Sequence, residues 1–276
     1  MHSAKRLVMI AVSLVYGTGL TCARALARGS AGDAEPIVMT YHSVRPEDVP
    51  RFERQMRHLS TRTTVFPDDR RRRNGRPPVA VTFDDAFQNV FDNALPVMAR
   101  HRIPATIFTP TGYLGGTAEW IARAGGSAPA VVSADVVAST DRTRVRFASH
   151  TVSHPRLASL ERDVVRDELT QSKRALESLV AEPVTMLALP YGSFSTPVLE
   201  EARAAGYDRV FANVPVTRGA GDGLVGRINV TPADWPLEFR LKARGAYGWM
   251  ALAVPAKRAV RALLKGTGHN DSGAAE

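Results

Sequence analysis

Seven short apolar runs alternate with stretches of helical spacing along most of the chain. These runs begin near residues 37, 79, 105, 145, 185, 209 and 225. Strands that alternate with helices form parallel sheets, because each helix returns the chain to the same end of the sheet. Seven such strands are enough for a small barrel. We therefore predict an α/β fold, a distorted, incomplete (β/α) barrel of about seven strands.

Polar residues follow several of these predicted strands directly. Sites in parallel α/β folds form at the carboxyl ends of strands, so these side chains are expected to lie near one another. Neighbouring residues of an extended chain point to opposite sides, so two adjacent aspartates can have different roles, one binding a metal and the other accepting a proton. A pair that caps the next helix is the structural alternative. The residues concerned are His42, Asp84, Asp85, His150 and Tyr191.

The chain is basic, with 36 lysines and arginines against 27 aspartates and glutamates and a formal net charge of +9. This balance suits nucleic acid, anionic lipid or anionic polysaccharide. The arginine run at 70–73 stands beside Asn74 and Gly75 without interleaved aromatic residues, which predicts a solvated loop, and we expect no nucleic-acid partner. The single cysteine, Cys22, excludes a disulfide framework and a thiolate metal site.

The first 27 residues have the pattern of a targeting segment. Lys5 and Arg6 precede a mildly apolar run from Leu7 to Leu20, and small residues follow it. The segment is either a signal peptide or an uncleaved helix that lies on a membrane surface. The first interpretation places the protein in the cell envelope or outside the cell, on the periplasmic side. The alternative is the cytoplasmic face of the inner membrane.

Two histidines stand four residues apart at His150 and His154. This spacing allows both imidazoles to reach one cation, and imidazole with carboxylate suits zinc or another divalent transition metal. Together with Asp85 they form a set of two histidines and one carboxylate that leaves positions for water and substrate. Such a site polarises a carbonyl group and activates a water for hydrolysis. We therefore predict one divalent metal ion, with zinc as the first candidate.

Three motifs in this order resemble those of a known enzyme family. They are Thr-Phe-Asp-Asp at 82–85, His-Thr-Val-Ser-His-Pro at 150–155 and Leu-Pro-Tyr-Gly at 189–192. The chain is thereby similar to the polysaccharide deacetylases of carbohydrate esterase family 4, the NodB-homology domain, over residues 36–235. The resemblance implies a distorted (β/α) barrel that removes N-acetyl, less often O-acetyl, groups from sugars.

The resemblance also implies roles for individual residues. Asp84 resembles the general base, and Asp85, His150 and His154 resemble the metal ligands. The backbone N–H of Tyr191 resembles the donor that stabilises the oxyanion, because the proline before it has no N–H to compete.

Two departures from the family pattern concern the surroundings of the base. Ala86 stands where the family has glycine, which strains the loop if that position needs a positive φ. Ala188 stands where many members carry the arginine that holds the catalytic aspartate. We suggest that Arg227, on the last predicted strand, supplies this guanidinium; a surface arginine on an edge strand is the alternative.

The general acid is the third departure. The Leu-x-x-His motif that many members carry near the C-terminus does not follow Arg227. However, the segment 40–44, Thr-Tyr-His-Ser-Val, resembles the N-terminal strand of the poly-N-acetylglucosamine deacetylase branch, from which the acid histidine comes. We assign His42 as the acid that protonates the leaving amine; a histidine hydrogen-bonded at a strand end is the alternative.

Aromatic residues near these motifs are candidates for contacts with the sugar, although each suits a core equally well. The candidates are Tyr41, Phe87, Tyr113 and Trp120, with Tyr191 beside them. Residues 236–276 combine apolar and aromatic residues with lysines and arginines, and end in a disordered stretch. This basic amphipathic helical tail either lies on an anionic membrane surface or packs back on the barrel.

The sequence thus predicts a metal-dependent hydrolase of carbon–nitrogen bonds other than peptide bonds, acting on linear amides. Its expected substrate is an N-acetylhexosamine-containing polysaccharide, during exopolysaccharide biosynthesis or modification. A peptidoglycan deacetylase or an O-acetyl esterase on the same site is the alternative. A hypothesis from another class of protein is a catalytically weak, membrane-associated glycan-binding protein. It is suggested by the departures at Ala86 and Ala188 and by the missing C-terminal histidine motif.

Overall fold

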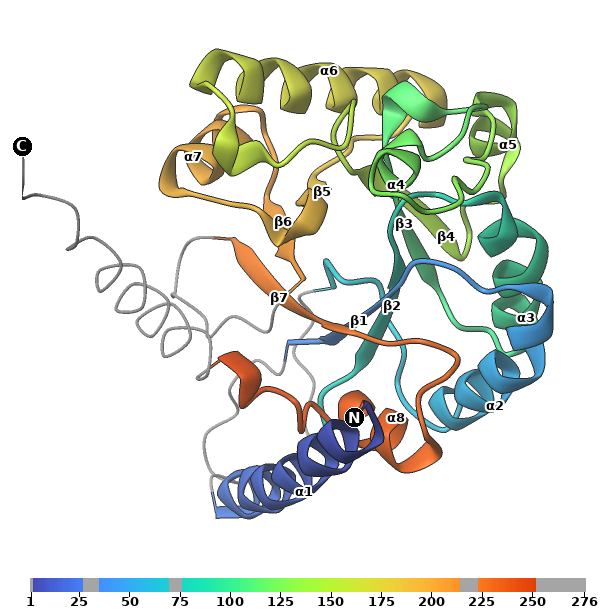
Figure 1. The fold of residues 1–276 in the computed structure, drawn as a ribbon, viewed down its shortest axis with the longest axis vertical. Helices are drawn as coiled ribbons and strands as arrows, with labels where there is room; N and C mark the ends of the chain where they lie inside the picture. Colours follow the sequence, from blue (N-terminus) through green and yellow to red (C-terminus); the bar gives the residue numbers. More distant parts are fainter. Residues whose placement is uncertain (1, 27–34, 70–75, 214–222, 252–276) are drawn as a thin grey trace, which may run out of the picture.

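Seven parallel strands form a closed barrel in the computed structural model, which describes residues 2–26, 35–69, 76–213 and 223–251. Each strand pairs with the next in the chain, and β7 closes the ring by pairing with β1 at Val38 and Arg227. The predicted seven-strand (β/α) barrel is confirmed, and its ring of strands is complete (Figure 1). The strands are β1 (Ile37–Tyr41), β2 (Val79–Phe83), β3 (Ala105–Thr109), β4 (Val145–Ser149), β5 (Met186–Ala188), β6 (Arg209–Ala212) and β7 (Leu224–Asn229).

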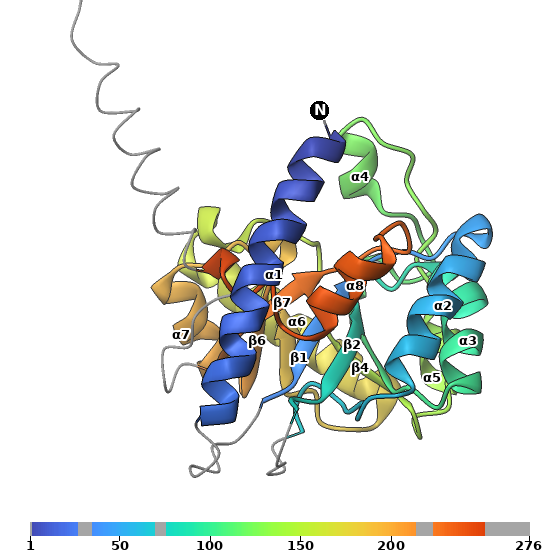
Figure 2. The same cartoon turned by 90° about the horizontal axis from the view of Figure 1, so that it is seen from below.

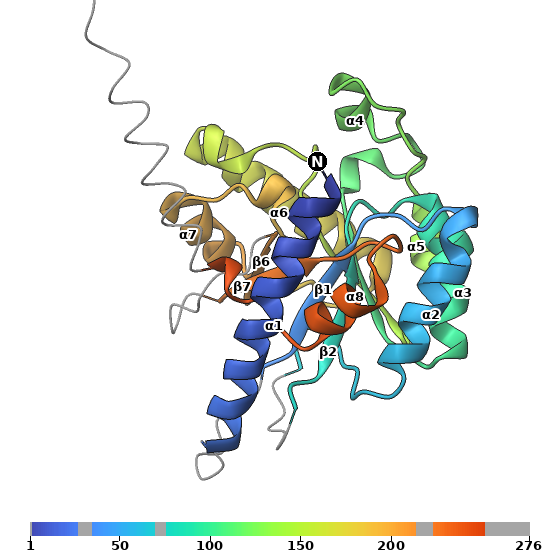
Figure 3. The ribbon, with the colours of Figure 1, turned by 60° about the horizontal axis from the view of Figure 1, so that its bottom comes forward.

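Helices cover the outside of the barrel and bury one apolar stripe each against it. In the longest of these covering helices, α6, the residues Val165, Leu169, Leu176 and Val180 recur at helical spacing and are buried. The covering helices are α2 (Val49–Leu59), α3 (Leu95–Arg100), α5 (Ala134–Ser139), α6 (Arg162–Val180), α7 (Thr196–Ala204) and α8 (Pro236–Ala243). The short helix α4 (Glu119–Arg123) instead packs its buried Trp120 on His154. The N-terminal helix α1 (His2–Leu26) lies outside this layer, against α8 (Figures 2 and 3).

One wide turn interrupts the helical segment after β2. Residues Val90–Ala94 form a π-helix, and α3 begins at Leu95 with Pro96 in its first turn. A proline is tolerated there because the first N–H groups of a helix have no intrahelical acceptor. Wide turns of this kind often occur beside functional sites.

The barrel interior is filled by a small apolar cluster of its own, below the carboxyl ends of the strands. Ala80, Ala148 and Ala188 leave room in it for the rings of Phe108 and Phe211, whose centroids lie 5.3 Å apart. Side chains alternate between the two faces of a strand, so the residues two or four positions further along point inward at the mouth of the barrel. On β1, β2, β4 and β7 those residues are polar.

Helix α8 and the segment after it pack back on the molecule. Phe239, Leu241 and Tyr247 are buried, so up to residue 251 the predicted tail covers the barrel and α1. The rest of that tail, residues 252–276, lies outside the described residues, as does the arginine run at 70–73. Among the described helices, none combines the length and the hydropathy needed to cross a membrane.

Candidate active site

A buried carboxylate and a buried guanidinium face each other at the mouth of the barrel. Arg227 Nη1 and Nη2 donate to Asp84 Oδ1 and Oδ2 over 2.6 and 2.7 Å, and both side chains are fully inaccessible. Nη2 also donates to the side-chain oxygen of Asn213. The position suggested for Arg227 therefore lies beside the first aspartate and not on the surface. Burial alone would raise the pKa of Asp84, but Arg227, with His150 and His42, holds it below its ordinary value.

The second aspartate points away from this pair, toward the two histidines. Asp85 Oδ1 lies 3.5 Å from His150 Nε2 and 3.2 Å from His154 Nε2, and all three side chains are buried. His150 Nδ1 donates to the carbonyl oxygen of Ala188 over 2.8 Å, which leaves Nε2 as the free nitrogen of that ring. Burial would raise the pKa of Asp85, but the two imidazoles hold it well below the usual range.

These three side chains fit a metal ion. One ligand atom from each lies within 4.8 Å of the others. Asp85 Oδ1 is buried without a hydrogen-bond partner among the described residues, and buried polar atoms without partners are rare in folded proteins. A cation between the carboxylate and the imidazoles satisfies all three, and this donor set suits zinc and similar divalent ions.

Glu168 on α6 holds the loop that carries the histidines. Its Oε2 accepts hydrogen bonds from the backbone N–H groups of Val152 and Ser153 over 2.8 and 2.9 Å, and its Oε1 accepts one from the Ser153 hydroxyl over 2.5 Å. Three hydrogen bonds accepted by one carboxylate thus fix the turn between His150 and His154. The sequence contains no local signal for this residue.

Replacing Glu168 with alanine is expected to weaken zinc binding about tenfold, because groups that orient metal ligands typically contribute 10–100-fold to affinity. Competition titration of metal-free protein against a chromogenic chelator measures this change. Glu182→Ala is the control, because it removes an exposed carboxylate whose ion pair with Arg142 lies outside the site. Unchanged affinity in Glu168→Ala would show that the turn holds its shape without this carboxylate.

The loop after β1 places His42 beside the buried pair. His42 Nε2 lies 3.9 Å from Asp84 Oδ2, and the histidine side chain is 39% exposed. Asn89 donates to the Ser43 hydroxyl and accepts from the N–H of Val44, and Asn93 donates to the carbonyl of Val44. Two asparagines from the wide turn after β2 therefore hold this loop, which gives that turn its role in the site.

The turn after β5 presents an unused backbone donor. Tyr191 has φ 58°, and the N–H groups of Gly192 and Ser193 donate to the carbonyls of Leu189 and Pro190. Within the part of the chain that the structure describes, the N–H of Tyr191 donates to no group. It is therefore free to donate to a bound group. The Tyr191 ring packs edge-on against His154, with 4.8 Å between the ring centroids.

Aromatic side chains form one wall of the metal cluster. The Trp120 ring stacks on the His154 ring at 4.4 Å, and Tyr113 contacts Trp120 edge-on at 4.8 Å. Phe87 lies behind them, stacked on Trp120 at 6.4 Å and almost fully buried. Of the four predicted sugar contacts, Tyr113 and Trp120 thus lie at the cluster, and Phe87 supports them.

The suggestion that Tyr41 lines the site is wrong. Its ring is fully buried between β1 and α2, with Phe52 at 5.2 Å, and its hydroxyl donates to Gln55 Oε1 over 2.8 Å. The reason is the alternation along β1. Thr40 and His42 point into the barrel, so Tyr41 between them points outward into the helical layer.

Strained backbone is concentrated around the site. Five of the seven non-glycine residues with positive φ in the described part of the chain belong to the three motifs or follow one directly: Asp85, Ala86, Thr151, His154 and Tyr191. Such conformations cost free energy and persist where the surroundings fix them, often at functional sites. Ala86 has φ 49°, so the position where the resembling family has glycine does require the left-handed region.

Comparisons with known proteins show the family of the chain. The family model described as polysaccharide deacetylase matches residues 71–210, about half of the chain. A chitooligosaccharide deacetylase from Sinorhizobium fredii is 32% identical over 142 residues, 51% of this chain and 59% of that protein. The peptidoglycan-N-acetylmuramic acid deacetylase PdaA from Bacillus subtilis is 23% identical over 202 residues, covering 71% and 70% of the two chains.

Solved structures share the fold. The deacetylase PplD from Streptococcus pyogenes, in complex with acetate, superposes with a TM-score of 0.64 at 19% identity, over 77% of this chain and 99% of that one. The structure of IcaB from Ammonifex degensii gives 0.63 at 22% identity, over 77% and 98%. With half of the chain matching the family model and the three motifs meeting at one end of the barrel, the chain belongs to the polysaccharide deacetylase family.

Proposed function

We propose that the protein is a metal-dependent hydrolase that removes N-acetyl groups from an N-acetylhexosamine-containing polysaccharide. One observation carries the proposal. Adjacent carboxylates are divided between two environments, Asp84 against Arg227 and His42, and Asp85 against His150 and His154. This division supplies a base and a metal site within one short segment.

Asp85, His150 and His154 are the residues that would hold the ion. When bound, a divalent metal polarises the acetyl carbonyl and lowers the pKa of water, and zinc is the first candidate. Asp84 accepts the proton of the attacking water. Its lowered pKa keeps it ionised at neutral pH, and Arg227 fixes the orientation of its carboxylate.

Two further groups complete the reaction. The free N–H of Tyr191 donates to the oxygen on which negative charge develops. His42 lies on the Asp84 side of the site and protonates the nitrogen of the sugar as it leaves. The half-buried ring of Tyr113, which packs edge-on against the buried Trp120, offers an apolar surface against which a sugar ring can pack.

The substrate class is supported by the names of the relatives. One acts on chitooligosaccharide and another on peptidoglycan N-acetylmuramic acid, and both substrates carry N-acetylated amino sugars. We propose an exopolysaccharide of this kind, deacetylated during its production or modification. We place the protein at the cell envelope.

The test compares acetate release from two substrates by the zinc-loaded full chain and by His42→Ala. The parent is expected to deacetylate an N-acetylglucosamine oligomer faster than an O-acetylated xylan fragment. The variant is expected to lose about 100-fold on the amide and less on the ester, because an amine must be protonated to leave whereas an alkoxide is a better leaving group.

Two outcomes would contradict the proposal. Parent protein that is folded and zinc-bound yet releases acetate only from the ester would be an O-acetyl esterase. Release from neither substrate, nor from peptidoglycan fragments, would support a glycan-binding protein. His58→Ala, which changes a histidine that packs against Phe239 far from the site, serves as the control variant.

A further inference from the structure

The N-terminal helix α1 has two apolar faces, and only one of them is covered. Leu7, Val8 and Val15 are 55%, 62% and 76% exposed, although they are among the most apolar residues of the chain. Ala4, Ala11, Val12 and Leu14 are also exposed on this side of the helix. Residues spaced by three, four and seven positions form one continuous stripe on a helix. We call these seven residues the outer face of α1.

The opposite face of α1 is fitted to the body of the protein along several turns. Ile10 and Ser13 are buried, and Ser13 accepts a hydrogen bond from Trp249 Nε1 over 2.9 Å. Gly17 allows close approach, since a Cβ there would lie 2.9 Å from the Cβ of Ala246. At the N-terminal end, Arg6 Nε donates to Glu238 over 2.5 Å and the Arg6 guanidinium stacks on Trp235. Contacts of this specificity make α1 a part of the fold.

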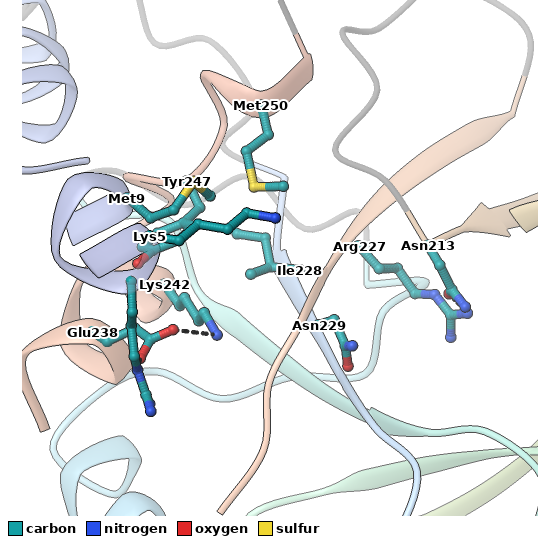
Figure 4. A pocket seen from close by; sticks show the side chains of 11 residues that line it. Lys5, Met9, Asn213, Arg227, Ile228, Asn229, Glu238, Lys242, Tyr247 and Met250 are labelled. Atoms are coloured by element: carbon teal, nitrogen blue, oxygen red, sulfur yellow. Dashed lines mark hydrogen bonds and ion pairs between the residues drawn. The ribbon is translucent and has the colours of Figure 1, made fainter. Parts of the chain in front are cut away.

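A pocket between α1 and the barrel supports the same conclusion. It has a volume of about 290 Å³ and is bounded by the first turns of α1, by β7 and by the segment 247–250. Figure 4 shows Lys5 extending into it between Met250 and Ile228, while Arg227 and Asn213 close its far end. Helix α1 and β7, the strand that carries Arg227, therefore line the same pocket.

The surface beside the outer face is basic. Helix α1 contains no acidic residue. On α8, which lies next to it (Figure 3), the exposed stripe consists of Leu237, Arg240 and Arg244. The one acid of α8, Glu238, is buried and paired with Arg6 and Lys242. Trp235, 40% exposed, stands between the two helices.

We propose that α1 stays on the mature protein and seats it on an anionic lipid membrane, with the outer face in the boundary between headgroups and acyl chains and Arg240 and Arg244 on lipid phosphates. An exposed apolar helix face flanked by cations and an aromatic ring is the pattern of helices that lie in a membrane interface. A second copy of the chain fits less well, because an interface between two outer faces would gather the basic residues of both copies without an unpaired acidic residue from α1 or α8.

The experiment is flotation of the full chain with vesicles of phosphatidylcholine, with and without about 30 mol % phosphatidylglycerol. The variant Leu7→Gln/Val8→Gln/Val15→Gln is expected to bind anionic vesicles at least about tenfold more weakly than the parent. Arg240→Gln/Arg244→Gln is expected to lose the preference for the anionic vesicles. The control is Val164→Gln, an exposed valine on α6 at the other side of the barrel, which should bind as the parent does.

Failure of the parent to float with anionic vesicles would overturn the proposal, and so would three further results. The first is a mature chain from the producing cells whose intact mass shows that α1 has been removed. The second is light scattering that shows a dimer which the triple variant dissociates, because a second copy then covers the outer face. The third is a lower melting temperature of the triple variant without vesicles, which would mean that another part of the chain already covers the outer face. Failure to float leaves the deacetylase proposal untouched, since acetate release is measured on soluble substrate.

Discussion

Replacing Asp84 with asparagine is expected to lower the rate of acetate release by about 10⁴-fold, at the upper end of what a positioned base contributes. The amide has nearly the shape of the carboxylate but accepts no proton from water near neutral pH. The metal cluster does not include Asp84, so zinc binding should stay close to that of the parent. Acetate release and zinc stoichiometry measured on the same preparation therefore separate loss of the base from loss of the metal.

The control for this variant is Asp135→Asn, a change at an exposed aspartate in the first turn of α5. Its activity should equal that of the parent. If Asp84→Asn bound zinc normally and kept more than a tenth of the activity, another group would have to take the proton. His42 would be the first to test, since its Nε2 lies 3.9 Å from Asp84 Oδ2.

Much of the site could be predicted because side chains alternate along a strand, and this alternation determines which residues point into the barrel mouth. On β7 and β1, Val225 and Val38 belong to the interior cluster, so Arg227 and His42, two and four residues further along, point into the barrel mouth. The same rule applied to β1 would have excluded Tyr41, which stands one residue from His42. It would also have found Asn213, two residues after the buried Phe211, whose side-chain oxygen accepts from Arg227.

Other parts of the site had no signal in the local sequence. Glu168 is one of several acidic residues on α6, and its three hydrogen bonds to the loop at 152–153 depend on how that helix crosses β4. Asn89 and Asn93 act on the loop of His42 only because the wide turn after β2 brings them there. Such contacts join segments that are distant in sequence, and helix or strand periodicity carries no information about them.

The contacts of the N-terminal segment could not be predicted from its sequence either. Its composition is that of a targeting sequence, and a signal peptide needs no inward face. In the structure Arg6, Ile10, Ser13 and Gly17 recur every three or four residues and contact α8 or the segment after it. A stripe that includes a charged, a hydroxyl and a glycine residue is fitted to particular partners, which composition alone does not reveal.

Replacing Arg227 with methionine is expected to lower acetate release about 10³-fold, because the orientation of the base is lost, and to lower the free energy of unfolding by about 3–5 kcal/mol. The stability loss follows from burial: both partners are inaccessible, so the variant leaves an uncompensated carboxylate in the interior. Urea unfolding of the metal-free proteins measures it. Arg227→Lys keeps a charge but not the two-pronged contact, and should recover more stability than activity.

The pH dependence of that loss has a definite sign. In the parent, burial would raise the pKa of Asp84, but Arg227 together with His150 and His42 lowers it, so the carboxylate stabilises the fold above its unfolded-state pKa. Without the guanidinium the pKa rises, and the folded variant takes up a proton before the unfolded chain does. The difference in stability between parent and Arg227→Met should therefore be largest at neutral pH and shrink as the pH falls toward about 4.

A second buried arginine separates the two effects. Arg209 begins β6 at the opposite end of the barrel, where it pairs with Glu35 at 3.4 Å. Arg209→Met should also lower the free energy of unfolding but leave the acetate-release rate of the folded fraction unchanged. If both arginine variants lost activity in proportion to stability, the role of Arg227 would be to stabilise the fold and not to position Asp84. A large loss of turnover confined to Arg227→Met would assign to it the positioning of Asp84, because only that arginine touches the base.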